Sequence, residues 1–262
     1  MIVIKYGGHA LDQSVANDQI IAAIARFHGE GRKVLLVHGG GPAIDAELVT
    51  HHIETTTISG YRVTTPEVLE VVQRTLSGEV LRDLTNRFIA HGVNAVGLSS
   101  GDGNTLRATR FKPIVDGEQV DIGLVGEAQN VDPTFLNLLL SNGYLPVISP
   151  IAVQINGEAL NMNADIAAGS IAGALDADEV LFITDVPGIL RDWPDSGSLI
   201  NEITLSELQR IESTFTGGMA PKVKAVITAL KSGAKQARII DGRSASNLAS
   251  ALHGQGGTVI TA

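Results

Sequence analysis

Two apolar segments near the N-terminus end abruptly in glycines, and few folds accommodate such a pair. The segment "IVIKYGGHA" covers Ile2–Ala10, and "VLLVHGGGP" covers Val34–Pro42. Short apolar, β-branched runs predict buried strands, and the glycines after them predict tight turns at the strand ends. The first run also contains Lys5. Because an unpaired charge is costly inside a core, we expect Lys5 to lie at the last position of its strand and reach beyond the sheet.

The rest of the sequence alternates between similar apolar runs and helical patterns. This alternation predicts an α/β fold whose parallel sheet is covered by helices on both faces. The predicted strands are Met1–Ile4, Val34–Val37, Ala95–Leu98, Leu145–Ser149 and Val180–Thr184, with weaker candidates at Arg238–Ile240 and Gly257–Ile260. The predicted helices are Val15–His28, Pro66–His91, Pro133–Asn142, Asp165–Leu175, Ser206–Ile211 and Pro221–Lys231.

Two segments depart from this alternation. Leu106–Val125 alternates like a strand and has a turn at Asp116–Gly117, which predicts an antiparallel hairpin. The segment "RDWPDSGS", Arg191–Ser198, predicts a surface loop. Since no stretch has the composition of a linker, we expect one domain with two lobes, residues 1–175 and 176–262.

Composition excludes several classes of function. The 262 residues carry a net charge of −9, which argues against a nucleic-acid partner. The absence of cysteine excludes disulfides, thiolate nucleophiles and cysteine-ligated zinc. The sequence shows neither a signal peptide nor an apolar segment of the roughly 20 residues that a membrane span needs. We therefore expect a cytoplasmic protein that does not associate with membranes.

The glycine runs predict a site for a phosphorylated ligand. In open parallel sheets, ligands bind at the carboxyl ends of the strands, and glycine turns there expose backbone N–H groups. Neither run is a Walker A loop or a dinucleotide-binding G-x-G-x-x-G motif. The glycines alone are also consistent with sharp turns, and Lys5 alone with a solvated lysine at a strand end.

Three polar residues precede an Ala- and Gly-rich helical pattern in "ALNMNADIAAG", Ala159–Gly169. Asn161, Asn163 and Asp165 occupy alternate positions, which would place them on one side of an extended segment. Two amides and a carboxylate arranged in this way would hold a ligand carboxylate and orient lysines. Asn and Asp are also ordinary helix N-caps, so a purely structural interpretation stays open.

Lys222 and Lys224 stand near the start of the predicted helix in "FTGGMAPKVKAVITAL", Phe215–Leu230. Lysines there oppose the helix dipole by about 0.3–1 kcal/mol unless an anion binds between them and the N-terminus. The alternative is two solvated lysines.

Two other segments add candidate ligand-binding residues. Arg62 precedes a predicted helix, and its guanidinium group suits a carboxylate. Thr184, Asp185 and Gly188 follow a buried strand, where a nucleotide would fit. Each segment alone is equally consistent with an ordinary surface residue or turn.

Taken together, these segments resemble the amino-acid kinase superfamily, and within it the N-acetylglutamate kinases. The resemblance runs from Ile2 to about Val259. "GYRVT" followed by "NMNAD" is what points to the acetylglutamate branch, since related kinases share the glycine loops. The matching segments, in family order, are "KYGGHA", "VHGGGP", "GYRVTTPE", "IGLVGE", "NMNADIAAG", "TDVPGIL" and "GGMAPKVKA".

The resemblance implies a three-layer αβα sandwich and ATP-dependent phosphorylation of the γ-carboxylate of N-acetyl-L-glutamate, the second step of arginine biosynthesis. The N-terminal lobe would bind the acetylamino acid and form the dimer, and the C-terminal lobe would bind Mg-ATP. The implied residues are Lys5, Lys222 and Asp165 for catalysis; Gly40, Gly41, Arg62 and Asn161 for the acceptor; Gly7 and Gly8 around the phosphate; and Thr184, Asp185, Gly188, Gly217, Gly218 and Met219 for the nucleotide.

The expected chemistry agrees with these residue types. Phosphoryl transfer needs positioning and charge neutralisation, and an ionised carboxylate nucleophile needs no general base. Mg²⁺ would be held mainly by phosphates and water, so no protein metal ligand is assigned. The acyl phosphate would need shielding from water, and the hairpin Leu106–Val125 is a candidate for part of a lid.

The sequence also departs from the family pattern. His9 stands where the family often has asparagine, and Ser246 stands where arginine-inhibited members have histidine. Those members carry an extra N-terminal helix that links dimers into hexamers, whereas this sequence begins at the first strand. We therefore expect a homodimer that arginine does not inhibit. The alternatives are a sister kinase acting on carrier-linked aminoadipate or glutamate, and a ligand sensor that has kept the fold.

Overall fold

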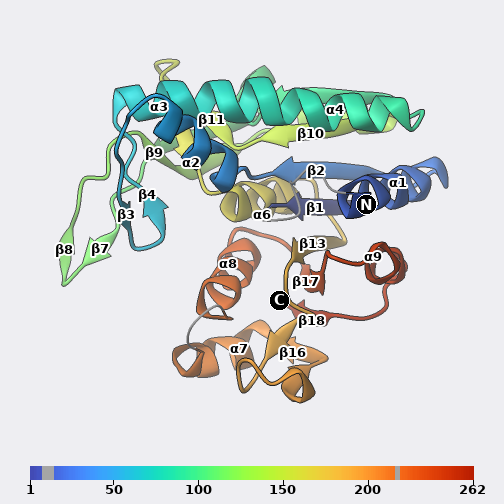
Figure 1. The fold of residues 1–262 in the computed structure, drawn as a ribbon. Coiled ribbons are helices and arrows are strands. Elements are labelled where there is room, and N and C mark those ends of the chain that lie inside the picture. Colours follow the sequence, from blue (N-terminus) through green and yellow to red (C-terminus); the bar gives the residue numbers. More distant parts are fainter. Residues whose placement is uncertain (8–14, 216–218) are drawn as a thin grey trace.

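The computed structural model describes residues 1–7, 15–215 and 219–262, with the backbone alone for Val15, Ala16, Asn17 and Pro221. Figure 1 shows helices on both sides of a central sheet. The predicted αβα sandwich is therefore confirmed. Within the described ranges, no helix is both long and apolar enough to span a membrane.

An eight-stranded sheet crosses the molecule in the order β16-β18-β17-β13-β1-β2-β10-β5. Neighbouring strands run parallel except for β17 and β18, which are antiparallel. All seven predicted strands lie in this sheet, so the mostly parallel arrangement is confirmed. The strands are β1 (Ile2–Tyr6), β2 (Val34–His38), β5 (Ala95–Ser99), β10 (Leu145–Ser149), β13 (Glu179–Thr184), β16 (Glu202–Thr204), β17 (Gln236–Asp241) and β18 (Thr258–Thr261).

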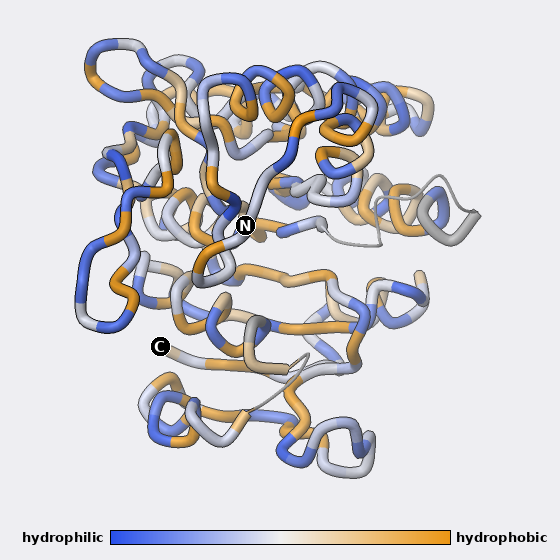
Figure 2. The backbone as a smooth tube through the Cα atoms, turned by 60° about the vertical axis from the view of Figure 1, so that its left-hand side comes forward, coloured by the Kyte–Doolittle hydropathy of each residue, from blue (hydrophilic) through white to orange (hydrophobic). Residues whose placement is uncertain are grey.

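Two hydrophobic cores lie on the two faces of the sheet because its central strands are apolar at successive positions. Figure 2 shows these apolar central strands inside a more hydrophilic periphery. One face is covered by α1 (Val15–Gly29), α4 (Leu81–Ala90) and α9 (Ala245–Leu252). The other is covered by α5 (Thr134–Ser141), α6 (Ala164–Ala174), α7 (Leu205–Ile211) and α8 (Met219–Lys231).

The predicted excursion at Leu106–Val125 is an antiparallel hairpin, as expected. At its tip Asp116 and Gly117 have φ of 51° and 88°, the left-handed values of a tight hairpin turn. The structure adds that the returning strand continues to Val131 and takes part in a closed four-stranded barrel. The barrel strands are β6 (Leu106–Arg110), β9 (Val125–Val131), β11 (Ile151–Val153) and β12 (Ala159–Met162); the hairpin tip is β7 (Ile114–Val115) and β8 (Glu118–Gln119).

One continuous helix covers Pro66–Ala90, close to the predicted Pro66–His91. The Thr65 hydroxyl accepts a hydrogen bond from the Val68 N–H and caps its start. The helix comprises α3 (Pro66–Gln73), the π-helical segment η2 (Arg74–Val80) and α4, and the π geometry was not predicted.

Two helices were also missed: α2 (Gly41–Thr50) and α9. α2 begins at a glycine and a proline without a side-chain cap, so its sequence is typical of a turn. The predicted surface loop at Arg191–Ser198 is largely exposed and is confirmed. The remaining short elements are β3 (Thr57–Ile58), β4 (Tyr61–Arg62), β14 (Ile189–Leu190), β15 (Leu199–Ile200), η3 (Asp102–Asn104), η4 (Ser196–Ser198) and η5 (Glu212–Thr214).

Candidate active site

The strand order places the predicted ligand-binding segments side by side. β1 lies between β2 and β13, and all three strands run parallel. Tyr6, near the end of β1, pairs with His38 on one side and Ile183 on the other. The glycine turn after β2, the glycine after β1 and the "TDVPG" turn after β13 therefore follow one another along the carboxyl edge of the sheet. This edge is where parallel sheets bind ligands.

The end of β1 and the glycine turn after β2 contact each other closely. The Gly39 N–H donates a hydrogen bond to the Tyr6 carbonyl at 2.8 Å. A Cβ placed on Gly39 would lie 3.7 Å from the Gly7 Cα, and one placed on Gly7 would lie 2.7 Å from Lys5 Nζ. Gly7 thus allows the lysine ammonium group to lie directly against the backbone, where a larger residue would displace it.

Lys5 forms an ion pair with Asp165, with Nζ and Oδ1 3.1 Å apart. Both side chains are largely buried, at 16% and 18% exposure, so the pair is weakly screened. Lys5 is the second-to-last residue of β1 and not its last, because the strand continues to Tyr6. The pair joins β1 to α6 across one face of the sheet.

The prediction that Asn161, Asn163 and Asp165 lie on one extended segment is wrong in part. Asn161 lies in β12, but α6 begins at Ala164, and Asn163 caps it by accepting hydrogen bonds from two backbone N–H groups. The local preference of asparagine for the N-cap explains this early helix start. Asp165 therefore stands in the first turn of α6, where the helix dipole favours its negative charge.

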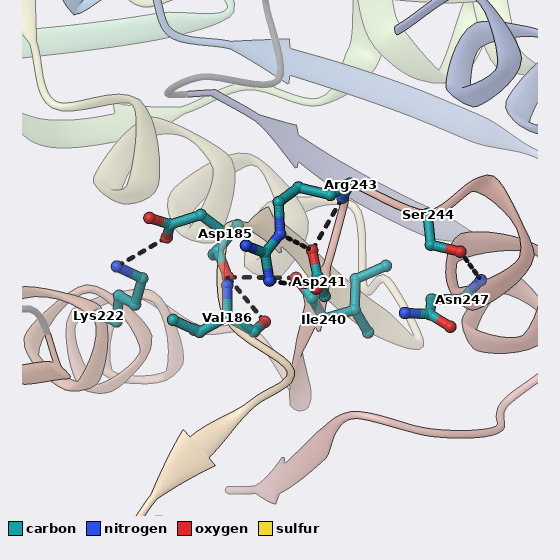
Figure 3. A network of polar contacts seen from close by, with 9 residues as sticks. Asp185, Val186, Lys222, Ile240, Asp241, Arg243, Ser244 and Asn247 are labelled. Atoms are coloured by element: carbon teal, nitrogen blue, oxygen red, sulfur yellow. Dashed lines mark hydrogen bonds and ion pairs between the residues drawn. The ribbon is translucent and has the colours of Figure 1, made fainter. Parts of the chain in front are cut away.

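Lys222, in the first turn of α8, forms a second ion pair with Asp185, with Nζ and Oδ1 3.0 Å apart. Asp185 follows directly after β13 and is half exposed. In Figure 3 its carboxylate lies between Lys222 and Arg243. Both predicted catalytic lysines thus form ion pairs with carboxylates that were also predicted as site residues. Lys5 pairs with Asp165, and Lys222 pairs with Asp185.

Asp241 and Arg243 extend this charged group but were not predicted as site residues. The Arg243 side chain donates to both oxygens of Asp241 at 2.9 and 2.7 Å (Figure 3). These hydrogen bonds lower the pKa of the Asp241 carboxyl and raise the pKa of the Arg243 guanidinium group from their ordinary values. A sequence signal did exist, since "DGR" follows the predicted strand Arg238–Ile240.

Arg62 and Asn161 are linked to each other through Thr64. The Asn161 amide donates to the Thr64 hydroxyl at 3.2 Å, and that hydroxyl donates to the Arg62 carbonyl at 2.8 Å. The Arg62 guanidinium group donates to Asp45 of α2 at 2.5 Å. Thr64 and Asp45 thus contact predicted site residues but were not themselves predicted.

The structure shows why the "IGLVGE" segment needs a glycine at Gly123. Its φ of +79° is left-handed, and a Cβ there would lie 2.2 Å from the Thr64 carbonyl oxygen. Backbone hydrogen bonds join Thr64 to both neighbours of this glycine, Ile122 and Leu124. The segment therefore holds the strand that carries Arg62 against the barrel.

Tyr61 connects the hairpin to the site. Its ring packs on Phe111 with centroids 4.7 Å apart. Burial, and then the carboxylates of Glu127 and Asp165, raise the pKa of Tyr61. A pocket of about 460 Å³ opens nearby, beneath the hairpin tip. It is lined by Arg110, Phe111, Lys112, Pro113, Ile114, Gln119 and Glu127.

His38 is a fully buried residue directly before the Gly39–Gly41 turn. Its Nδ1 donates to the Gly39 carbonyl at 2.8 Å, which leaves Nε2 as an acceptor, and Nε2 has no hydrogen-bond partner among the described residues. Burial lowers the pKa of His38 from 6.5 to about 4. The side chain is therefore neutral at physiological pH.

The other predicted site residues have varied surroundings. Gly40 caps α2 and Gly41 begins it. Thr184 bonds through its hydroxyl to the Ile240 carbonyl, and a Cβ on Gly188 would lie 2.4 Å from Thr258 Oγ1. Met219 is fully buried in the core. The predicted residues Gly8, Gly217 and Gly218, together with His9, lie outside the described residues.

Comparison with known proteins identifies the family. The model of the "Amino acid kinase family" matches residues 1–241. The chain belongs to this family of phosphotransferases.

Two curated relatives define its branch. An acetylglutamate kinase from Frankia casuarinae is 41% identical over 242 residues, which cover 92% of this chain and 67% of the relative. An acetylglutamate kinase from an Arthrobacter species is 43% identical, covering 92% and 80%. Within the family the chain thus falls among the acetylglutamate kinases and is an enzyme.

A solved structure supports the fold independently. N-acetylglutamate synthase from Neisseria gonorrhoeae superposes with a TM-score of 0.84 at 23% identity, and covers 100% of this chain. The chain corresponds to 59% of that protein's length. At this identity the likeness concerns the fold alone.

Proposed function

We propose that this enzyme transfers the γ-phosphoryl group of ATP to the γ-carboxylate of N-acetyl-L-glutamate. The products are N-acetyl-L-glutamyl 5-phosphate and ADP, as in the second step of arginine biosynthesis. The supporting observation is the order of groups along the carboxyl edge of the sheet: the glycine turn of β2, the Lys5–Asp165 pair of β1, and the Asp185–Lys222 pair after β13. The names of the relatives agree with this acceptor.

The acceptor side has the groups that a dicarboxylate needs. Arg62 supplies a guanidinium group suited to a carboxylate. Gly40 and Gly41 open α2 without a side-chain cap, so a negative charge near this N-terminus is favoured by the helix dipole. Asn161 supplies an amide for the acetylamino group. Together these residues would fix the γ-carboxylate towards Gly7.

The two lysines would carry most of the electrostatic stabilisation. A γ-carboxylate oxygen forms a bond to the γ-phosphorus while the bond to the β,γ-bridging oxygen breaks, and ADP leaves with that electron pair. No proton moves, so no general base is required. Lys5 and Lys222 would neutralise charge on the equatorial oxygens, with Asp165 and Asp185 orienting their ammonium groups.

The nucleotide would bind after β13, at Thr184, Asp185 and Gly188, and at residues 217–219. Mg²⁺ bound with ATP would supply further neutralisation of phosphate charge. The described residues contain no group of three potential metal ligands. In this proposal the ion is held mainly by phosphates and water.

We also propose that residues 1–175 form the acceptor-binding and dimerisation lobe and residues 176–262 the ATP-binding lobe of a cytoplasmic homodimer. β5 is an edge strand of the sheet, and Ile89 of α4, the helix that packs against β5, is exposed. Sedimentation should give twice the mass of the 27.4 kDa chain, unchanged by arginine. A hexamer, or inhibition of activity by arginine, would contradict this assembly.

The activity can be tested by trapping acyl phosphate with hydroxylamine. Purified enzyme would be supplied with ATP, Mg²⁺ and N-acetylglutamate, glutamate or N-acetylaminoadipate. We expect hydroxamate with N-acetylglutamate only. Product from another acceptor alone would overturn the proposed substrate.

Two lysine variants would locate the reaction. Lys222→Ala should lower kcat roughly 10²- to 10³-fold, as expected when one charge-stabilising donor is lost. Lys224→Ala, two residues further along α8 and exposed, is the matched control and should retain activity. Equal activity in both variants would show that Lys222 has no catalytic role.

A further inference from the structure

The π-helical segment η2 interrupts an otherwise α-helical stretch beside the acceptor side of the site. Its flanking residues Gln73 and Leu81 both have α-helical backbone angles, so the wide turn is local. Its sequence, "RTLSGEV", contains no proline that would force a kink. π-helical turns within α-helices occur frequently at functional sites.

Leu76, in the middle of η2, packs directly against the glycine turn. A Cβ placed on Gly40 would lie 2.6 Å from Leu76 Cδ2 and 3.5 Å from Val80 Cγ2. Leu76 is also buried in a cluster with Ile44 and Leu48 of α2. The same side chain therefore contacts both the turn and the helix that the turn begins.

Ser77 fixes this π turn to the sheet. Its hydroxyl lies 3.0 Å from the Ser99 hydroxyl and 2.8 Å from the Ser149 hydroxyl, and these two lie 3.3 Å apart. Three hydroxyls at these distances can each donate and accept one hydrogen bond, which closes a ring. Ser99 ends β5 and Ser149 ends β10, the strand next to β2. The ring thus anchors η2 at the edge where the acceptor would bind.

We propose that η2 is a positioning element for the acceptor, in which Ser77 fixes the π turn and Leu76 sets the position of Gly40 and the N-terminus of α2. This inference rests on the proposed function for the identity of the acceptor. Leu76 and Ser77 are positioning residues, because they act through the glycine turn. ATP, bound on the opposite side of β1, should be unaffected by changes in η2.

Steady-state kinetics of Ser77→Ala test this selectivity. The KM for N-acetylglutamate should rise roughly five- to tenfold, the equivalent of one lost hydrogen bond, while the KM for ATP and kcat stay near the wild-type values. Ser141→Ala, at an exposed helical serine, is the control. Equal changes in both KM values, or a fall in kcat alone, would overturn the proposal.

A compensating pair tests the Leu76 contact. The added methyl of Gly40→Ala would point at Leu76, so this variant should raise the KM for the acceptor. Adding Leu76→Ala should recover part of the loss by removing the clashing methyl groups. Failure of the double variant to recover, with the fold intact by circular dichroism, would exclude Leu76 as the contact that positions Gly40.

Hydrogen exchange without substrate separates this inference from the proposed function. Ser77→Ala should speed amide exchange in residues 39–45 and leave residues 179–185 unchanged. That outcome would support the positional role even if wild-type enzyme does not phosphorylate N-acetylglutamate. Unchanged exchange in residues 39–45 would overturn the positional role, whatever the acceptor.

Discussion

Lys5 and Lys222 each lie beside a carboxylate, but their surroundings differ. The Lys5–Asp165 pair is mostly buried, whereas Asp185, the partner of Lys222, is 52% exposed. A buried lysine needs its partner to remain charged and correctly placed. We therefore expect the negative charge of Asp165 to hold Lys5 in place, which a neutral side chain of the same size would not do.

Asp165→Asn tests this dependence. The variant keeps the size of the side chain but removes the negative charge beside Lys5. We expect kcat to fall roughly 10- to 100-fold through misplacement of the ammonium group, and Tm to decrease. Asp176→Asn, whose partner Lys235 lies on the surface, is the control and should change neither value. An Asp165→Asn variant with wild-type kcat would contradict the assigned role.

His38 makes stability depend on pH. Its pKa is about 4 in the folded protein and 6.5 as the ordinary value, so the unfolded chain binds the proton first as pH falls. The contribution of neutral His38 to the free energy of unfolding is therefore fully present above pH 6.5 and is lost as the pH falls towards 4. The loss between pH 7.5 and 4.5 should be about 2–3 kcal/mol. Urea unfolding of wild type and His38→Asn at several pH values measures the difference, and parallel curves would contradict it.

At the scale of elements, α6 and α8 pack unusually closely, and they carry Asp165 and Lys222. A Cβ on Gly169 of α6 would lie 2.4 Å from the Ala229 Cα of α8. One turn further, a Cβ on Gly173 would lie 2.7 Å from the Gly233 Cα. Because backbone cannot give way as a flexible side chain can, these glycines set the distance between the two helices.

The added methyl group of Gly169→Ala should increase the distance between α6 and α8. Despite the better helix propensity of alanine, we expect a loss of about 1–3 kcal/mol in unfolding free energy from overpacking, together with a lower kcat. Gly29→Ala, where a Cβ would meet no atom of the described residues within 4 Å, should be neutral. Thermal unfolding and kinetics on both variants make the comparison. If Gly169→Ala is as stable and active as wild type, the helix contact does not control the site.

The elements differ in how far the sequence predicts them. The central strands are apolar at successive positions, so all seven predicted strands were found in the sheet. α2 was missed because Gly41 and Pro42 are typical of turns, and its helix depends on packing of Ile44 and Leu48 against Leu76. The barrel was missed because its closure depends on pairing between segments far apart in the sequence, such as Val153 with Arg107.

The candidate site was predictable where a motif combined glycine with charge. Lys5, Arg62, Asp165 and Lys222 all stand in such motifs. The partners Asp45 and Thr64 were not predicted, because their importance comes from a contact with a residue distant in sequence or from strand pairing. The ring of Ser77, Ser99 and Ser149 is likewise visible only once the strands are placed side by side.

At the scale of the whole molecule, one sheet carries both sides of the proposed reaction. β1 joins β2, on the acceptor side, to β13, on the nucleotide side, through continuous parallel pairing. The γ-carboxylate and the γ-phosphate would therefore meet at Gly7 and Lys5. This arrangement predicts direct transfer between the two ligands and little transfer to water.

Isotope transfer from labelled acceptor tests this central claim most directly. N-acetylglutamate labelled with oxygen-18 in its γ-carboxylate would be incubated with ATP, Mg²⁺ and enzyme, and the acyl phosphate cleaved with hydroxylamine. Hydroxylamine attacks the acyl carbon, so the released phosphate keeps the bridging oxygen. We predict that this phosphate carries the label when measured by mass spectrometry. Unlabelled phosphate would mean that water, and not the carboxylate, had attacked ATP.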